Sequence, residues 1–267
     1  MPVSFWGRVS FLLQEYWKSY LAGAGTTLLI ALVATFIGVL IGLLVGIIQT
    51  IPVEKNDNPV KKGVLKVVKA ILFVYVELFR GTPMMVQAMF IFYGALQYMN
   101  INMNMWFAAF FIVSINTGAY MAETVRGGIL SIDPGQTEGA KAIGMTHFQT
   151  MNYIILPQAL RNIMPQIGNN LIINIKDTSV LSVISVTELF FVGKSVAGVY
   201  YTTFESFFIV SIMYLVMTVT SARILRHFES KMDGADNYDL ATDDTLAHTS
   251  GMTTYIDKKK KDEEEYR

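Results

Sequence analysis

The chain has 267 residues, of which 52% are hydrophobic and 16% are charged, and its mean hydropathy is +0.42. A soluble domain of this size carries more charge and fewer long apolar runs, so the composition excludes an ordinary soluble protein. A formal net charge of zero argues against nucleic acid as a partner, and the absence of cysteine excludes disulfides and thiolate metal sites.

Residues 1–20 combine aromatic side chains with a few charges, and include Trp6, Trp17 and Tyr20. Tryptophan and tyrosine favour the headgroup region of a membrane. We therefore expect an amphipathic helix that lies at the membrane interface. The stretch has no clear cleavage site, so we do not expect it to be a signal peptide.

Residues 19–53 contain no charged side chain. At about 1.5 Å per helical residue this run is long enough to cross a hydrocarbon core of roughly 30 Å. Within it Gly38, Gly42 and Gly46 recur at four-residue intervals, which gives one helix face that another helix can approach closely. We expect that partner helix to belong to the same chain, although a subunit interface is the alternative.

A lysine-rich stretch, residues 54–69, follows this first span. Basic residues concentrate in cytoplasmic loops of membrane proteins, so the N-terminus is expected outside. The five lysines of the stretch are Lys55, Lys61, Lys62, Lys66 and Lys69.

The second span is interrupted. Residues 67–79 and 84–97 are apolar, but Arg80-Gly81-Thr82-Pro83 separates them. Proline lacks a backbone donor and disfavours helical geometry at the residue before it, so the helix should break at Thr82.

Three further spans are expected at residues 105–122, 163–191 and 206–222, the second of them interrupted at Lys176-Asp177-Thr178-Ser179. The model is an all-α integral membrane protein with five transmembrane helices in residues 21–230, the N-terminus outside and the C-terminus in the cytoplasm. Residues 231–267 are polar and poor in aromatics, and are expected to form a disordered cytoplasmic tail. Basic residues near span ends support this orientation. Those inside are Lys55, Lys61, Lys62, Lys66, Lys69, Arg126, Lys141, Arg161, Arg223, Arg226 and Lys231, and those outside are Arg8, Lys18 and Lys194.

A polar loop, residues 127–157, lies between the third and fourth spans. Asp133-Pro134 is typical of a helix start, because aspartate caps free N–H groups and proline suits the first turn. We expect a short helix over residues 137–143, with Ala140 and Ile143 on one face, that ends at a left-handed Gly144. Such a helix is too short to cross a bilayer and should lie beside it.

The spacing from Glu138 to Pro157 resembles the EAA loop of permease subunits of ATP-binding-cassette importers, with Gly139 where the motif usually has alanine. The resemblance implies the type I importer permease fold and a coupling helix that docks in a groove of an ATPase subunit. The residues that the motif assigns to this coupling are Glu138, Gly139, Ala140, Ile143 and Gly144.

Residues 77–83, the loop, Lys176-Asp177-Thr178-Ser179 and Glu188-Leu189 together resemble the polar amino-acid subfamily of these permeases. The resemblance implies a multi-pass protein of the cell membrane that carries glutamine, glutamate, arginine or histidine. It also implies a second permease subunit, alike or different, two ATPase subunits that bind the ATP, and an extracellular substrate-binding protein. No cofactor is expected in this chain.

The two helix breaks are candidate contacts for a zwitterionic substrate, because a discontinuous helix presents polar groups at membrane depth. The helix that starts after Thr82 offers N–H groups to a carboxylate, with Gln87 one turn further on. An intramembrane acid, Asp177, is positioned to accept the ammonium group, and Asn174 and Ser179 would supply neutral hydrogen bonds. The alternative is structural. Asp177 would then pair with Lys176, Arg80 or a partner subunit and cap the helix that follows, and Thr82 would cap its own helix.

Other function classes have less support. Gly193-Lys194-Ser195 matches only the end of a phosphate-binding loop, since Glu188 stands where the first glycine belongs. We therefore expect no enzyme and no ATP hydrolysis by this chain. An ion-coupled secondary transporter would need internal repeats, which we do not find. A structural half of a heterodimer that binds no substrate stays open.

Overall fold

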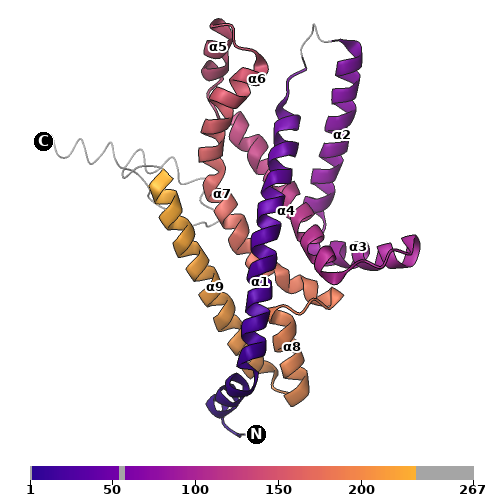
Figure 1. Cartoon of the computed structure of the whole chain (residues 1–267), viewed down its shortest axis with the longest axis vertical. Coiled ribbons are helices and arrows are strands. Elements are labelled where there is room, and N and C mark those ends of the chain that lie inside the picture. Colours follow the sequence, from indigo (N-terminus) through magenta and orange to yellow (C-terminus); the bar gives the residue numbers. More distant parts are fainter. Residues whose placement is uncertain (1, 54–57, 233–267) are drawn as a thin grey trace, which may run out of the picture. The chain divides into compact units, whose positions relative to one another are not determined.

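The computed structural model describes residues 2–53 and 58–232, and these ranges contain helices and no strand (Figure 1). The expected all-α class is therefore confirmed. The chain divides into two units, Met1–Glu229 and Ser230–Arg267, and the description below concerns the first. The expected disordered tail, 231–267, lies outside the described residues except for its first two, which close the last helix.

The first helix, α1 (Phe5–Thr50), is one element of 46 residues, where the sequence predicted two. It begins at Ser4, whose Oγ accepts a hydrogen bond of 3.2 Å from the Gly7 N–H. At about 1.5 Å per residue such a helix is longer than a hydrocarbon core of roughly 30 Å requires. Figure 1 shows its first turns inclined to the rest.

The glycine face of α1 packs on α4 (Met105–Leu130) of the same chain, as expected. A Cβ atom on Gly38 would lie 2.6 Å from Thr117 Cβ, and one on Gly46 would lie 2.7 Å from Val125 Cβ. Both distances are shorter than real contacts, so only glycine allows α1 and α4 to approach this closely.

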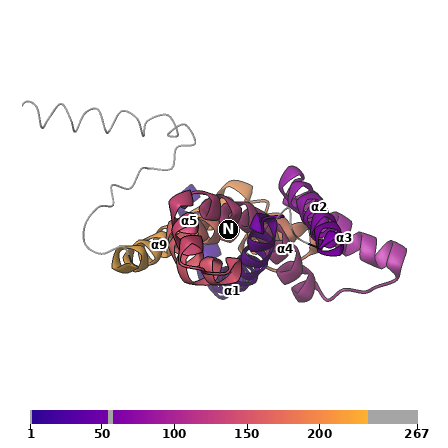
Figure 2. The same ribbon diagram turned by 90° about the horizontal axis from the view of Figure 1, so that it is seen from above.

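The predicted break in the second span divides α2 (Pro59–Gly81) from α3 (Met84–Met99). Thr82 is extended, with φ −123° and ψ 146°, and Pro83 follows at φ −63° and ψ 135°. Figures 1 and 2 both show α3 turning away from α2 and extending beyond α1 and α4. The proline and its extended neighbour therefore change the direction of the chain.

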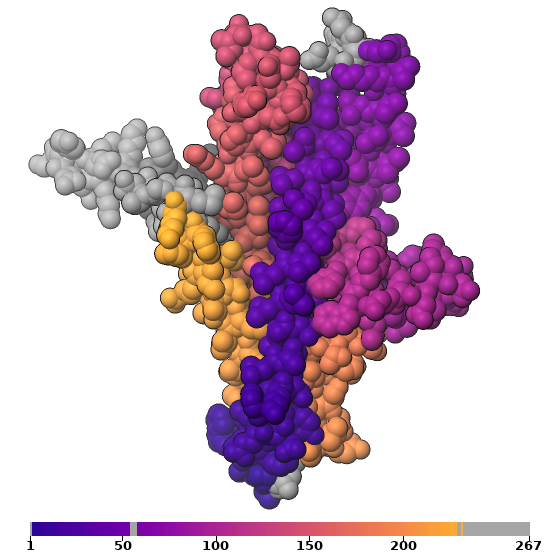
Figure 3. Space-filling view, viewed as in Figure 1, coloured from indigo at the N-terminus to yellow at the C-terminus, as the bar shows by residue number. Residues whose placement is uncertain are grey.

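The loop after α4 contains α5 (Pro134–Ala142) and α6 (His147–Thr150). A π-helical segment (Met151–Ile155) leads directly into α7 (Leu156–Asp177). The second predicted break is a 3₁₀ segment (Thr178–Ile184), after which α8 (Leu189–Tyr200) and α9 (Thr203–Met232) complete the chain. In the space-filling view α1 runs along the visible face, with α2 and α3 on one side and α5, α7 and α9 on the other (Figure 3).

By length and composition α1, α4 and the part of α9 up to Phe228 could each cross a membrane, and the bent pair that joins residues 147–184 to α8 would make a fourth span. The α2–α3 pair, our predicted second span, does not meet these criteria. The lysines of α2 and the 16-residue length of α3 explain this. The structure agrees with the sequence that the protein is a membrane protein with several helical spans. The expected number of five spans stays a prediction.

Candidate functional site

The break between α2 and α3 is held by the side chain of Gln87, which is 8% exposed. Its Nε2 lies 2.9 Å from Phe79 O, Thr82 O and Thr82 Oγ1, and its Oε1 accepts a hydrogen bond of 2.9 Å from Asn116 Nδ2 on α4. These contacts satisfy carbonyl groups that the broken helix leaves free. Thr82 Oγ1 also donates to Leu78 O at 2.8 Å, so Thr82 caps the end of α2, whereas α3 begins after Pro83 without a side-chain cap.

A second buried network joins α7 to α1 and α4. Asn174 Nδ2 donates to Thr35 Oγ1 at 2.7 Å and lies 3.0 Å from Thr117 Oγ1. Thr117 follows Asn116, the partner of Gln87, so two adjacent residues of α4 contact both interrupted spans. Polar groups in such a network are strongly positioned, because an unpaired one would be costly away from water.

A cavity of about 330 Å³ lies between these two networks. It brings together Thr82 from the first break, Asn174 and Asp177 from the end of α7, and Tyr120 from α4. Gln87 does not line the cavity, but it forms hydrogen bonds with Thr82 and Asn116, which do. The remaining lining residues are Pro83, Met84, Asn116, Thr117, Asn170 and Ile173.

Asp177 is half-buried and lines this cavity. It makes no hydrogen bond or ion pair to any residue in 2–53 or 58–232, and its side chain does not cap the 3₁₀ segment that follows. The ion pairs with Lys176 and Arg80, two of the three pairings that a structural role would use, are therefore not formed in the described residues; a pairing with a partner subunit stays open. Ser179, the other polar residue predicted beside it, does not line the cavity.

The helix α5 has the capping residues that the sequence predicts, Asp133 before it and Gly144 after it, but it spans Pro134–Ala142 and not the expected residues 137–143. Asp133 Oδ1 accepts a hydrogen bond of 2.7 Å from Gly135 N–H. At the other end Gly144 is left-handed, with φ +80°, and the N–H groups of Gly144 and Met145 donate at 3.0 Å to Lys141 O and Ala140 O. This arrangement is the Schellman motif, which fixes the direction of the chain after the helix.

The five coupling residues have different surroundings. Ala140 is 2% exposed and Ile143 is 78% exposed, so the two residues predicted on one face differ in burial. The reason is that Ile143 is the cap residue that follows the helix. A Cβ on Gly139 would meet open space. Ala140 therefore packs within the chain, while Gly139 and Ile143 are accessible to a partner.

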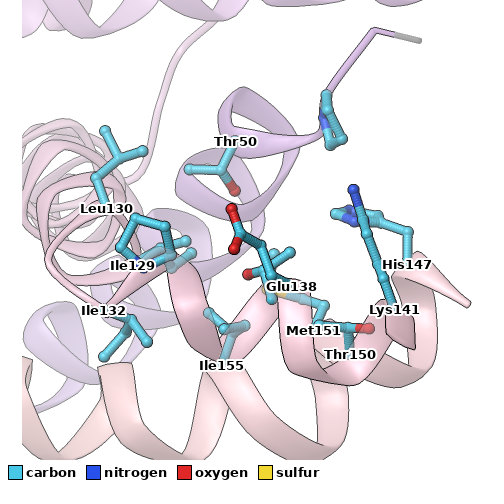
Figure 4. Close-up of a pocket in the computed structure, with 13 residues that line it drawn as sticks. Thr50, Ile129, Leu130, Ile132, Glu138, Lys141, His147, Thr150, Met151 and Ile155 are labelled. Atoms are coloured by element: carbon cyan, nitrogen blue, oxygen red, sulfur yellow. The ribbon is translucent and has the colours of Figure 1, made fainter. Parts of the chain in front are cut away.

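Glu138 lines a cavity of about 400 Å³ between α5 and the end of α1. Figure 4 shows its carboxylate directed toward Thr50, with Lys141 and His147 close together on the other side of the opening. The acid thus faces the junction between the loop and α1, and it remains exposed at the surface.

The loop leads into the helix that reaches the first cavity. Thr146 and Gln149 form a capping box at the start of α6. From His147 the chain is helical to Asp177, through the π-helical segment and past Pro165 inside α7. The end of the loop is therefore joined by helix to Asn174 and Asp177.

Four polar residues of the cavity were not predicted from the sequence, namely Asn116, Thr117, Tyr120 and Asn170. A signal was present for the first, because an asparagine in an otherwise apolar span is costly unless it has a partner. For Tyr120 and Asn170 there was no comparable signal, since their position depends on how α4 and α7 pack.

Comparison with known proteins bears on both regions. Residues 63–234 match the family described as binding-protein-dependent transport system inner membrane component. The chain belongs to this family. The glutamine transport system permease protein GlnP of Escherichia coli K12 is 39% identical over 163 residues, covering 61% of this chain and 74% of GlnP. The nopaline transport system permease protein NocM of Agrobacterium fabrum is 30% identical over 223 residues, covering 80% and 88%.

A solved structure of similar fold is described as an amino acid ABC transporter with histidines. It is 34% identical, has a TM-score of 0.74, and the match covers 86% of this chain and 100% of that chain. The expected importer permease fold is thereby confirmed. This permease is a multi-pass component of the cell membrane and not, in its family, an enzyme. Membership of a binding-protein-dependent family does not favour the ion-coupled secondary transporter.

Proposed function

We propose that this permease forms the path for polar amino acids of the glutamine, glutamate, arginine or histidine class in an ATP-driven importer. The relatives are described as glutamine, nopaline and arginine transport permeases, which supports a substrate with an amino-acid backbone. The proposed topology has five spans, with the N-terminus outside and the C-terminus in the cytoplasm. The ATP is hydrolysed by two separate ATPase subunits, and a second permease and an extracellular binding protein complete the assembly.

The observation that carries this proposal is the cavity between the two helix breaks. It combines the N-terminus of α3, which favours a carboxylate, with the carboxylate of Asp177, which favours an ammonium group. Asn174 and Thr82 add neutral hydrogen-bonding groups. A volume of about 330 Å³ is at the lower end of the range of small-molecule sites, which suits a single amino acid.

The proposed role of α5 is to carry the ATPase motion to this cavity. Its exposed Ile143 and open Gly139 suit docking in a groove, and the helical stretch from His147 to Asp177 connects it to the substrate contacts. Closure of the ATPase pair then moves α5 with α7, and the cavity opens to the outside.

The test is uptake by the reconstituted complex with Asp177→Asn, which keeps the size of the side chain and removes its charge. Loss of a hydrogen bond to a charged group costs about 1.5–3 kcal/mol, so we expect half-saturation to rise roughly ten- to hundredfold. Ser179→Ala is the matched control, because Ser179 does not line the cavity, and should leave uptake unchanged. Unchanged affinity and rate with Asp177→Asn would assign Asp177 a structural role.

A further inference from the structure

A third cavity, of about 390 Å³, lies between the end of α1, α2 and α4, and the function described above does not use it. Its lining is charged and of mixed sign. Lys69, Glu77 and Arg80 come from α2, and Glu123 and Arg126 come from α4. Gln49, next to the last residue of α1, is also in the lining.

These charges favour water or another protein over lipid. Glu123 and Arg126 lie in the last two turns of a helix long and apolar enough to cross the membrane, close to its proposed cytoplasmic end. The opposite face of α2 is apolar and exposed over the same length, with exposed fractions of 63% for Ile71, 62% for Val74 and 56% for Leu78. The helix α2 therefore lies between hydrocarbon on one face and a polar groove on the other.

The groove adjoins the substrate cavity. Tyr120 lines that cavity, and Arg80, which lines the groove, lies with its guanidinium carbon 5.8 Å from the centre of the Tyr120 ring. The Arg80–Tyr120 contact is thus shared by the two cavities. A substrate that leaves the substrate cavity beside Tyr120 would therefore enter this groove.

The charges in the groove are not all engaged with one another. Arg126 binds Glu123 through Nε, at 3.0 Å, and through a shorter bond from its terminal nitrogen. Among the residues in 2–53 and 58–232, Glu77 and Arg80 form no ion pair or hydrogen bond. The Arg80 guanidinium lies over the Tyr120 ring, and its charge also acts on Glu123 across the groove. Glu77 and Arg80 lie three residues apart on α2, and so are neighbours on one face.

We propose that this groove is an inner vestibule that binds the amino acid after it leaves the substrate cavity. Arg80 binds the substrate carboxylate and Glu77 binds its ammonium group, so that any zwitterionic amino acid is held by its backbone groups. The proposal rests on the proposed function, because it requires an amino-acid substrate that travels toward the cytoplasm.

The chain contains no cysteine, so single cysteines can report on the groove. Gln49→Cys places a thiol in the lining and leaves every charge in place. The complex with its ATPases is reconstituted with those subunits facing outward and treated with a biotin-linked, membrane-impermeant thiosulfonate, and biotin on the permease is measured. Glutamine, arginine and glutamate are each added as protectants, and uptake is measured with the same preparation.

We expect Gln49→Cys to be labelled from the ATPase side, and the transported amino acid at ten times its dissociation constant to slow labelling about tenfold by mass action. Adding Glu77→Gln should abolish the protection but not the labelling. Leu78→Cys, on the apolar face of the same helix, should label only after the membrane is dissolved in denaturant.

Absence of labelling at Gln49→Cys, or labelling that no amino acid slows in a preparation that still imports, would overturn the vestibule. Protection that survives Glu77→Gln would also contradict it, since the ammonium contact would then be elsewhere. Protected labelling without import would count against the proposed function alone.

Discussion

Single residues decide how closely the helices of this permease approach. The α1–α4 contact depends on glycines that leave no room for a Cβ atom, and the helix break at Thr82-Pro83 depends on one glutamine that satisfies several carbonyl groups. Both features are local, so substitutions at these positions test them directly.

Gly42→Ala should destabilise the permease. The added Cβ would lie 2.8 Å from the Met121 carbonyl carbon and 2.9 Å from the Ala122 nitrogen, and backbone atoms cannot move away as a side chain can. Overpacking of this kind costs about 1–3 kcal/mol, which should lower the melting temperature in detergent measured by tryptophan fluorescence. Gly25→Ala on the same helix has open space around it and should be neutral or stabilising. Equal melting of the two variants would contradict the packing argument.

Gln87→Leu should also lower the melting temperature, because it removes the hydrogen bonds to the carbonyl groups at the helix break and leaves the Asn116 amide with Phe79 O alone. The expected cost is about 1–3 kcal/mol. Gln97→Leu on the same helix is the control, since Gln97 is exposed, and it should melt like the parent. A Gln87 variant that melts like this control would show that water satisfies the break equally well.

At the scale of elements, the central feature is the connection from α5 through the turn at Gly144 to α6 and α7. The turn at Gly144 requires a positive φ, and an L-residue there costs about 1–2 kcal/mol. We expect Gly144→Trp to change the direction in which α5 leaves α6, so that ATP hydrolysis continues while transport falls.

The measurement is the ratio of amino acid imported to ATP hydrolysed. Gly139→Ala is the matched control, because its Cβ would meet open space and alanine favours the helix by about 0.5–1 kcal/mol; it should keep the parental ratio. Full, coupled transport by Gly144→Trp would count against α5 as the coupling element.

The sequence predicted the elements better than their surroundings. The helix break at Pro83, the turn at Gly144 and the glycine face of α1 follow from local chemistry, and the structure contains all three. The burial of Ala140 and the position of Ser179 outside the cavity could not be read from spacing, because both depend on how distant helices pack. The continuous α1 was missed because an aromatic, partly charged start and an apolar run were treated as separate elements.

At the scale of the whole molecule, the sidedness of the permease can be tested with single cysteines. Val3 is 90% exposed and should face the outside, whereas Gln136 at the start of α5 should face the cytoplasm. We expect a membrane-impermeant thiol reagent to label Val3→Cys in intact cells and to label Gln136→Cys only after the membrane is permeabilised. Labelling of Gln136→Cys in intact cells would reverse the proposed topology.

The central claim, that ATP hydrolysis drives polar amino acids through this permease, is tested most directly by uptake into proteoliposomes. These contain the permease with its ATPases and any second permease, with the binding protein on one side and ATP on the other. The account predicts uptake of labelled glutamine, arginine, glutamate or histidine that requires both ATP and the binding protein and that fails when Glu138 is replaced by a bulky residue. Uptake that follows an ion gradient and does not need ATP would contradict it.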